Sequence, residues 1–555
     1  MMSLLDDPVG RDGFADRLAV TLTLTIGGTA HVIAGGNVKE LALDLRSYGF
    51  SGSLAFLVQD DHAHGGDFTD DLITAFLKPD LIEVAVAIAA VLVTPEAGEI
   101  QPIRLTGLVL DKSVSEIVFR RLAGAPVLVR RYRIAFADPA RVLWTQHFPC
   151  QLYTDTSMVD VINDHLGDRI VIKYELSALT QPRRLVFLHL PRAAHASFAD
   201  FVSWYLDACG GVLSYDYATA SYLVAATKPD AGAPRALFGD DIARAELHYP
   251  AVPRYAPVVS NSNADSPRRE PIAQAQAQIG IRSDILLRTP IAQRVDDEIA
   301  LQRALAVIPC CEAHVQFGRV PSGALTPGAL VALPAANRWS AESALVGATW
   351  RVRRLRLGAV ASSPSLDHDL QLPSTGYQVA VSAELEAQAE PRIDRPRFCA
   401  PSYPGAVEGK VVCEQGKDGD KTYQIYRDAD TSLDEYQVHV PLWDKVVSAP
   451  FEPIFGSGNI YLPSYRAERV LLAIDVHGAN IAQLLEWRAG APLPMDAQGE
   501  HILFGKSEDS QTSVNHVYDG DKPVFNVART HQRDTALIQL REGTLLLQVK
   551  EQEEG

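Results

Sequence analysis

The sequence has few cysteines, and none of them is spaced for pairing. Six cysteines are scattered over 555 residues, at positions 150, 209, 310, 311, 399 and 413, and no Cys-x-x-Cys motif occurs. This pattern argues against a disulfide framework and fits a protein that folds with free thiols in a reducing cytoplasm. The adjacent pair Cys310 and Cys311 is expected to stay reduced, because neighbouring cysteines form a disulfide only with poor geometry.

Long apolar stretches are also absent. The longest apolar run, Leu81 to Val93, has thirteen residues and includes Glu83, so it is too short to span a bilayer. The N-terminal segment Met1 to Asp7 is acidic and lacks the apolar core of a signal peptide, so export through the Sec pathway is not expected. With 47% apolar and 21% charged residues, the chain is expected to form about three or four globular domains.

The charge balance and the short motifs argue against several classes of function. The formal net charge of −17 argues against binding to nucleic acid or to an anionic membrane. Gly49-Phe-Ser-Gly52 is one residue short of the Gly-x-Ser-x-Gly motif of hydrolases, and Gly416 to Thr422 lacks the spacing of a P-loop. No pair of carboxylates stands in a recognisable cleft-forming context. We therefore expect no catalytic residue and no cofactor.

One loop has the composition of a metal site. Residues 60–67 carry His62, His64 and Asp67 together with two further aspartates, and imidazole and carboxylate groups suit zinc or nickel. The alternative is a solvated loop between strands. It is favoured because a short His-x-His loop needs ligands from a second segment to close a site. We therefore predict that no transition metal binds there.

Alternating patterns predict a β-barrel in the first part of the chain. Residues 18–26 alternate apolar residues with threonine over nine positions, which is the pattern of a strand with one buried face. Further strands are expected at residues 41–45, 52–58, 103–110 and 127–136. Together they predict a barrel or half-barrel of antiparallel strands over residues 15–145.

The pattern changes to α/β over residues 146–227. Ser157 with Asp160 has the spacing of a helix capping box, and Ser197 is again followed by aspartate three residues on. The second helix is expected to stop at Gly210, before a hairpin that carries tyrosines.

The middle of the chain is expected to be irregular before strands resume. Residues 228–300 contain loop-like stretches and a low-complexity stretch at residues 273–278 that suits either a helix or an extended chain. A short helix is expected at residues 297–305. Strands are then expected at residues 311–317, 323–333, 348–357 and 377–383. They predict a second barrel within residues 228–395.

Residues 396–492 predict a small closed barrel. Tyr436, Val438 and Val440 alternate with polar residues, as in a strand with one buried face. Several short, curved strands with glycine and proline at their joins, within residues 405–487, are typical of an OB barrel.

Residues 493–555 are rich in short strands and contain no helical pattern. Strands are expected at residues 501–504, 514–518, 524–527, 535–540 and 544–550. So short a segment makes a poor core alone, whereas three copies around one axis would bury its leucines. On the last strand Leu545, Leu547 and Val549 share one face, which predicts that they close the axis and form a platform where a separate tip protein docks.

Three segments resemble VgrG-type spike proteins, which cap the tube of contractile injection machines. Val440-Pro-Leu-Trp-Asp444, after a glycine-led strand, resembles a segment of their OB domain. The helix that begins at Ser197, carries Phe201 and ends at Gly210 resembles the central α/β segment of their hub. Residues 325–333 resemble a strand entry of the same hub.

The resemblance implies a mainly β protein with a small α/β insert. Two tube-like barrels would form a hub over residues 1–395, followed by an OB-fold neck over residues 396–492 and a short trimeric β-prism or β-helix spike over residues 493–555. It further implies a homotrimer that caps a hexameric inner tube, contacts baseplate proteins and carries a PAAR-type tip protein or effector cargo. The trimer would be made in the bacterial cytoplasm, assembled into an injection particle and delivered or released outside the cell.

Two alternatives stay open at this point. A cell-wall hydrolase or metal-dependent enzyme with an OB module would require a substrate cleft with perturbed carboxylates. A trimeric tail adhesin would require a globular receptor head. The sequence does not distinguish a type VI secretion system from a phage-tail-like particle or a prophage tail.

Overall fold

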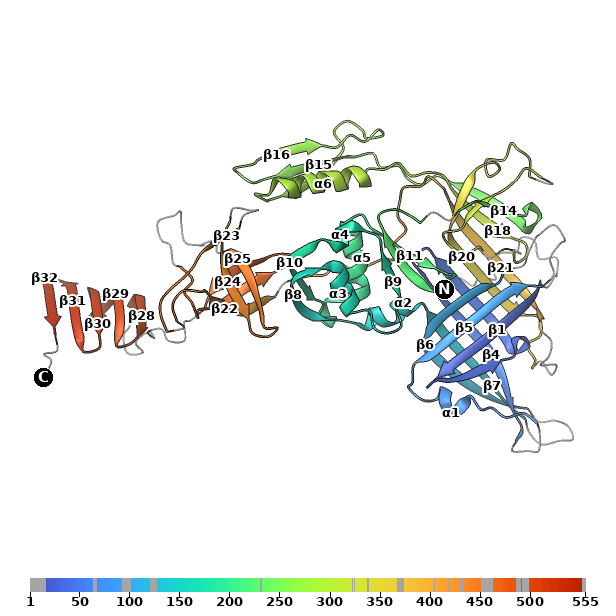
Figure 1. The fold of residues 1–555 in the computed structure, drawn as a ribbon, viewed down its shortest axis with the longest axis horizontal. Coiled ribbons are helices and arrows are strands. Elements are labelled where there is room, and N and C mark those ends of the chain that lie inside the picture. The colour runs from blue at the N-terminus through green and yellow to red at the C-terminus, as the bar shows by residue number, and fades with distance from the viewer. Residues whose placement is uncertain are drawn as a thin grey trace. The chain divides into compact units, whose positions relative to one another are not determined.

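The computed structural model describes residues 16–551 except for residues 63–66, 92–100, 120–126, 230–231, 322, 324, 337–338, 367–373, 404, 418, 429–432, 451–462, 486–490 and 492–498. The chain is mainly β, with 52% strand and 12% helix, which confirms the predicted fold class. Two compact units are formed (Figure 1): the first holds the residues up to Pro149, Ser157–Gln181 and Leu190–Ser402, and the second holds Cys150–Thr156, Pro182–His189 and the chain from Tyr403 onward. Among the described residues, no helix has the length and apolar character that a membrane crossing requires.

A closed ring of strands forms the base of the first unit. The ring runs β1-β5-β6-β7-β4-β3-β20-β21 and returns to β1. β2 pairs with β1 beside the ring, and the short helix α1 (Ile73–Phe76) follows β4. The bounds of the strands are β1 (Asp16–Ile26), β2 (Thr29–Ile33), β3 (Val38–Arg46), β4 (Gly49–Asp60), β5 (Ile82–Ala90), β6 (Ile103–Phe119), β7 (Val127–Ala137), β20 (Thr349–Ala361) and β21 (Thr375–Ala387).

The alternating sequence explains how the ring is filled. Along β1 buried residues alternate with more exposed ones, and Leu18, Leu22 and Leu24 have no exposed surface. Phe56 of β4 and Tyr132 of β7 are also fully buried, and their rings stack with centroids 5.1 Å apart. Inward-facing side chains therefore pack the interior, as expected for a barrel of this size.

Two strands from late in the sequence close the ring. β21 pairs with the first residues of β1, and β20 pairs with β3 along Arg354–Val360. Elsewhere along their length, β20 pairs with β19 (Leu330–Ala332) and β21 pairs with β18 (Glu312–Phe317). β13 (Arg235–Ala236) and β14 (Ile242–His248) extend the sheet further. The β20–β21 hairpin lies in the region predicted as a second barrel, residues 228–395. It also completes the ring formed by the strands predicted within residues 15–145.

The α/β segment follows the ring strands. Both expected capping boxes are present, since Ser157 and Ser197 each accept a backbone hydrogen bond from the aspartate three residues on, and that aspartate bonds back. Gly210, with a φ of 68°, ends the second of these helices in the left-handed conformation that glycine favours. The elements are α2 (Pro139–Leu143), α3 (Met158–Asp164), β9 (Ile172–Tyr174), α4 (Ser177–Thr180), α5 (Phe198–Ala208), β11 (Val212–Asp216) and β12 (Ser221–Ala225).

A small subdomain is inserted between β14 and β18. Its three-stranded sheet has the order β16-β15-β17, and α6 packs against it (Figure 1). The bounds are β15 (Ala256–Asn261), β16 (Arg268–Pro271), β17 (Arg282–Leu287) and α6 (Ala292–Leu305). The expectation of an irregular stretch over residues 228–300 is therefore wrong here. The core residues Val259, Ile272 and Val295 stand too far apart in the sequence to give a periodic signal.

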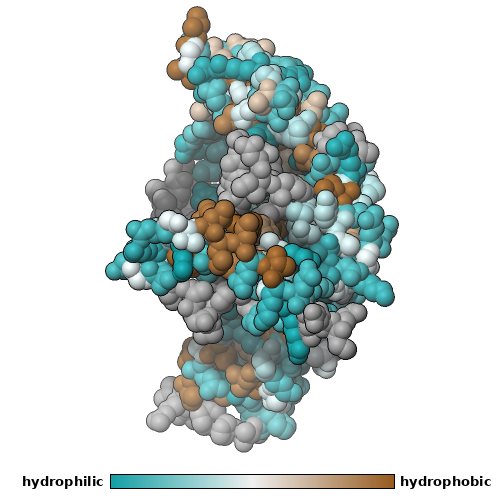
Figure 2. Space-filling view, turned by 90° about the vertical axis from the view of Figure 1, so that its left-hand side faces the viewer, coloured by the Kyte–Doolittle hydropathy of each residue, from teal (hydrophilic) through white to brown (hydrophobic). Residues whose placement is uncertain are grey.

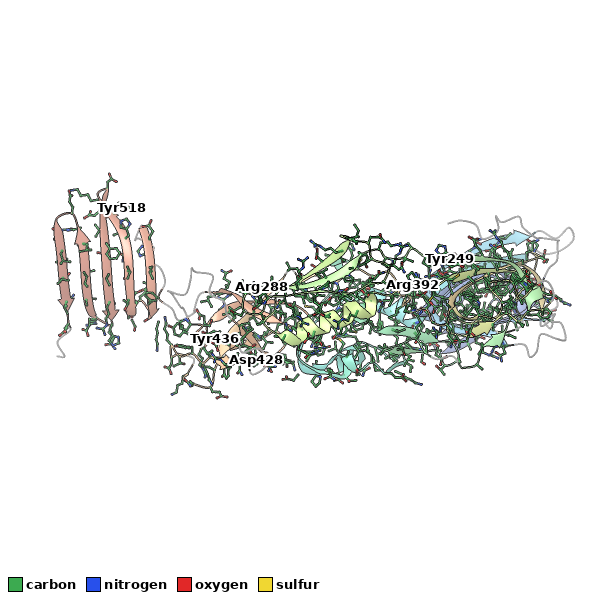
Figure 3. All side chains as sticks on the ribbon, turned by 90° about the horizontal axis from the view of Figure 1, so that it is seen from above. Tyr249, Arg288, Arg392, Asp428, Tyr436 and Tyr518 are labelled. Atoms are coloured by element: carbon green, nitrogen blue, oxygen red, sulfur yellow. The ribbon has the colours of Figure 1, made fainter. Side chains whose placement is uncertain are left out.

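The second unit contains a small barrel of the predicted type. Its strands have the order β25-β24-β22-β26-β27, and the end strands β25 and β27 also contact each other. Tyr436, labelled in Figure 3, is buried in the core of this barrel. The bounds are β22 (Ala406–Val412), β23 (Tyr426–Arg427), β24 (Asp434–Val440), β25 (Lys445–Pro450), β26 (Arg469–Ile474) and β27 (Ala479–Leu484).

Two strands from the α/β segment also belong to this barrel. β8 (Cys150–Ser157) and β10 (Pro182–His189) pair with each other and supply Leu152, Leu185 and Phe187 to its core. The backbone N–H of Phe187 donates to the carbonyl of Val476 at 3.0 Å. The chain thus enters the barrel before the α/β segment is complete, a connection that local patterns did not predict.

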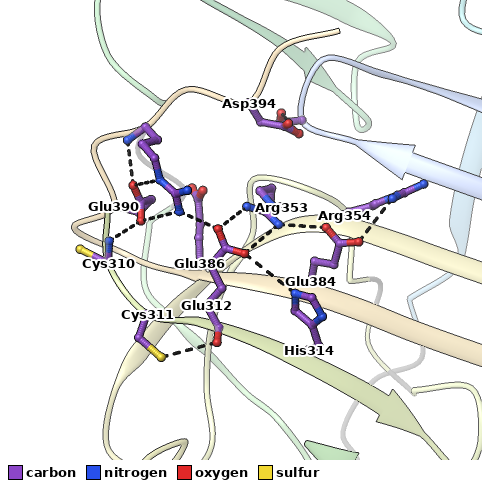
Figure 4. A network of polar contacts seen from close by, with 12 residues as sticks. Cys310, Cys311, Glu312, His314, Arg353, Arg354, Glu384, Glu386, Glu390 and Asp394 are labelled. Carbon is purple, nitrogen blue, oxygen red and sulfur yellow. Dashed lines mark hydrogen bonds and ion pairs between the residues drawn. The ribbon is translucent and has the colours of Figure 1, made fainter. Parts of the chain in front are cut away.

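A network of ion pairs holds the segment that we call the strap, residues 388–399, in the first unit (Figure 4). Glu312 of β18 accepts hydrogen bonds from Arg353 of β20 at 2.7 and 3.1 Å and from Arg392 of the strap at 2.6 Å. Glu390 accepts from Arg392 at 2.8 Å and from the backbone N–H of Cys310 at 2.7 Å. Burial acts to raise the pKa of Glu312, but the hydrogen bonds and charges of the two arginines outweigh it and lower the pKa.

We expect Glu312→Ala to lower the free energy of unfolding by about 3 kcal/mol, because it leaves two guanidinium groups without their shared carboxylate. Urea denaturation of the full chain measures this change. The pKa of Glu312 is lower in the folded chain than its ordinary value of 4.5. The ionised carboxylate therefore stabilises the fold at pH values above 4.5, and this stabilisation is lost as the pH falls through the lowered pKa. The variant and the parent should therefore converge in strong acid. The control Glu116→Ala removes an exposed partner of Arg130 and should cost only about 0–1 kcal/mol.

Candidate functional site

The C-terminal strands form one five-stranded antiparallel sheet in chain order, β28-β29-β30-β31-β32 (Figure 3). Two residues connect each strand to the next, the length that a tight hairpin turn requires. In the turn after β29, Gly520 and Asp521 have φ angles of 55° and 65°, so both central residues take the conformation of a type I′ turn. The bounds are β28 (Gly499–Ser507), β29 (Ser510–Asp519), β30 (Lys522–His531), β31 (Asp534–Arg541) and β32 (Thr544–Lys550).

The register of these hairpins sorts the side chains onto two different faces. A central row crosses all five strands and is apolar throughout: Ile502, Val514, Val527, Ile538 and Leu547. Since neighbouring residues of a strand point to opposite faces and every second residue shares a face, Phe504, Phe525, Leu540, Leu545 and Val549 lie on the same face as this row. We call this side of the sheet the apolar face.

The opposite face carries a polar row beside the central one. His501, Asn515, Asn526 and Gln539 are paired in register across four strands. The amide of Gln539 donates to Asn526 at 2.9 Å, and the amide of Asn526 donates to Asn515 at 2.8 Å. This ladder of amide groups fixes the register of the sheet from the side opposite the apolar face.

The apolar face is uncovered in the single chain. Leu545, Leu547 and Val549 are 61%, 68% and 70% exposed, and Ile538 is 45% exposed. Figure 2, which views the molecule from the side of β32, shows a patch of hydrophobic side chains at its centre. The three residues that the sequence singled out thus share one face, as predicted. Ile538 and the rest of the central row were not singled out, although their alternation with polar residues carries the same signal.

A sheet that is apolar on one face needs a second layer to bury that face. Exposed apolar patches on soluble proteins mark surfaces that bind another molecule. The amphipathic sheet therefore fits an assembly in which another apolar surface covers it.

The predicted metal loop lies elsewhere, in the first unit. His62 and Asp67 are among the described residues, whereas His64 lies outside them. The backbone N–H of His62 donates to the carbonyl of Phe68 at 3.0 Å. Among the described residues, no group of three or more histidine, cysteine, aspartate or glutamate side chains is arranged to hold a metal ion.

We expect the full chain, purified without a histidine tag, to contain no stoichiometric transition metal. The reason is that His62, His64 and Asp67 come from one short loop, and a closed site needs ligands from a second segment. Elemental analysis measures the metal content. One zinc or nickel ion per chain that disappears in the double variant His62→Ala, His64→Ala would contradict this expectation.

Comparison with known proteins gives a likeness of fold. No protein-family model matches the sequence, and no curated protein matches it significantly. A chain of the lidless PdpA–VgrG complex aligns with 97% of this chain and 99% of its own length, at a TM-score of 0.71 and 13% identity. This chain has a tail- or spike-like fold.

One further structure matches equally well, and another matches less well. A chain of the half-lidded Francisella PdpA–VgrG complex aligns with 98% of this chain and 90% of its own length, at a TM-score of 0.71 and 14% identity. The 43 kDa tail protein of prophage MuSo2 from Shewanella oneidensis aligns with 66% of this chain and 98% of its own length, at a TM-score of 0.37 and 11% identity.

Proposed function

We propose that this chain is a structural spike and hub protein of the VgrG type, and that it works as a homotrimer in a contractile injection machine. The uncovered apolar face of the C-terminal sheet is the observation that carries the proposal. The spike-like fold, matched over nearly the whole chain, supports it. The role is structural, and no side chain is assigned a chemical step.

Three copies of the C-terminal sheet can close into a triangular prism. The apolar face, which carries all the large side chains of the central row, would then point to the threefold axis and form a dry core. The amide ladder that contains Asn515 and Asn526 would face outward, where its unused polar groups meet water. The opposite orientation would bury the amides and expose Leu547 and Ile538, which is unfavourable.

The number of chains in the assembly tests this proposal. Native mass measurement or light scattering of the full chain at micromolar concentration should show three chains per particle. A monomer or a dimer under these conditions would contradict it. The test also separates the spike from a hydrolase that carries an OB module, for which no trimer is required.

The partners follow from the same proposal. The hub trimer would cap a hexameric inner tube within the baseplate and pierce the target envelope, and the spike would carry a PAAR-type tip protein or an effector. β32 supports the docking of a tip protein, because it is the last strand of its sheet and, within the described part of the chain, no strand pairs with its outer edge. Leu545, Leu547 and Val549 lie along this strand.

We expect intact particles to show extra density beyond β32, because an open strand edge pairs with other chains unless it is covered. Leu547→Lys should disrupt both the end of the spike and the docking, and so remove this density, because it places a charge in the apolar row that faces the axis. Electron microscopy of isolated particles makes the measurement. A needle that ends in β32 alone and still punctures its target would show that no tip protein is needed.

A further inference from the structure

A cavity of about 570 Å³ lies in the first unit. Five parts of the chain line it: the turn between β3 and β4, helix α2 with the residues after it, helix α5, the hairpin of β11 and β12, and the strap. The aromatic side chains Phe50, Trp144 and Tyr222 form part of its wall. Its volume is in the range of ligand-binding sites, about 300–1,000 Å³.

The charged groups at this cavity are mostly basic, in a chain whose net charge is −17. Four arginines and three aspartates line it: Arg46, Arg141, Arg395, Arg397, Asp44, Asp138 and Asp200. The excess of one positive charge is small, but on an acidic protein it favours an anionic group at this place.

The three carboxylates are already satisfied by donors of the chain. Asp44 accepts two hydrogen bonds from Arg354, at 2.6 and 2.7 Å. Asp200 accepts from the backbone N–H groups of Ser197 and Cys399, both at 2.9 Å. Asp138 is fully enclosed and accepts from the backbone N–H groups of Phe50 and Arg141 and from the hydroxyl of Tyr222.

Arg141 and Arg397 differ from the other two arginines, because neither forms a salt bridge with another described residue. Arg46 approaches Asp44 at 3.5 Å, and Arg395 approaches Asp207 at 2.9 Å. Arg141 and Arg397 have exposed side chains, and the salt bridges between described residues include neither of them. The charge of Arg141 acts on the nearby carboxylate of Asp138, but neither guanidinium group forms a salt bridge with another described residue. Both can therefore bind an anion, and their planar shape suits a carboxylate.

We propose that this cavity binds a carboxylate-bearing peptide segment of a partner protein, with Arg141 and Arg397 as its anchors. The arginines bind the carboxylate of an aspartate or glutamate side chain of that segment. This site is independent of the apolar face and of the trimer, so a failure of one proposal leaves the other standing.

Isothermal titration calorimetry of the full chain at low salt tests the site. The probe is hexaglutamate with an acetylated N-terminus and an amidated C-terminus, and hexaglutamine with the same ends is the neutral control. Hexaglutamate should bind once per chain, and hexaglutamine should not bind. The double variant Arg141→Glu, Arg397→Glu should raise the Kd by about tenfold or more, since each lost hydrogen bond to a charged group lowers the binding affinity strongly.

A matched variant separates the site from general charge effects. Arg192→Glu with Arg294→Glu makes the same change in net charge at exposed positions of the first unit outside the cavity, and it should keep most of the affinity. If the glutamate variant does not fold, as judged by circular dichroism, Arg141→Gln with Arg397→Gln takes its place and should also weaken binding.

Three results would overturn the proposal. The first is no binding of hexaglutamate by the parent chain at low salt. The second is equal loss of affinity in the two double variants. The third is tight binding of inorganic phosphate that displaces the peptide completely, which would make the cavity a site for free anions only.

Discussion

Ile538→Lys is expected to convert the assembly into separate chains. Ile538 belongs to the central apolar row, between Val527 and Leu547, so in a closed prism it lies next to the axis. A lysine at this position would place three ammonium groups in the dry core, and each unpaired buried charge costs several kcal/mol. Light scattering should therefore change from three chains to one.

Gln539→Lys is the matched control for this change. Gln539 is the next residue of the same strand and lies on the opposite face, in the amide ladder. The same charge is added at the same depth of the sheet, but it points to solvent in the proposed prism. The trimer should survive, apart from the loss of one hydrogen bond of about 0.5–1.5 kcal/mol. Equal behaviour of the two variants would contradict the proposed orientation of the sheet.

Asp138→Ala is expected to have the largest effect on the stability of the first unit. Its carboxylate is fully buried and accepts from Phe50 and Arg141, both at 3.0 Å, and from Tyr222. The substitution leaves three donors without an acceptor, at about 1–3 kcal/mol each. A loss of about 3–6 kcal/mol, measured by urea denaturation, approaches the whole stability of a typical domain.

A control variant and the dependence on pH test this expectation further. Asp138→Asn keeps one acceptor oxygen and should cost less than alanine. Burial raises the pKa of Asp138 although three donors point at it, so the folded chain takes up this proton at a higher pH than the unfolded chain. As the pH falls toward the ordinary value of 3.8, this group therefore favours the folded state. A loss below about 1 kcal/mol in Asp138→Ala would contradict the proposed role of the carboxylate.

Much of the local structure could be predicted because its signals are local. The alternation of threonine with apolar residues gives β1, and the serine–aspartate spacing gives both capping boxes. The five strands of the C-terminal sheet follow from short apolar segments separated by pairs of turn residues. In each case neighbouring residues decide the outcome through the backbone geometry that they favour.

The connections between distant segments could not be predicted in this way. Arg354 of β20 is 310 residues from its partner Asp44, and no local pattern identifies β20 as the strand that closes the ring. β8 and β10 read as parts of an α/β segment, yet Leu152 and Phe187 pack in another unit. Long-range packing, which determines these pairings, leaves no periodicity in the sequence.

The candidate site was predicted in part for the same reason. The alternation in β32 placed Leu545, Leu547 and Val549 on one face. The amide ladder was missed because Asn515, Asn526 and Gln539 become neighbours only when the hairpins are in register. The cavity with Arg141 and Arg397 joins residues from both ends of the first unit, so its chemistry is invisible along the chain.

The closure of the first ring by β20 and β21 has a consequence for the time course of folding. Until these strands exist, β3 and the first residues of β1, Asp16 to Leu18, are the open edges of a six-stranded sheet, because β2 covers β1 only from Leu22 onward. Roughly 250 residues separate the end of β7 from the end of β21, and a ribosome adds about 5–20 residues per second. The nascent chain therefore waits on the order of 10–50 s before β20 and β21 can pair with these edges, long enough for a chaperone, or a neighbouring nascent chain, to reach them first.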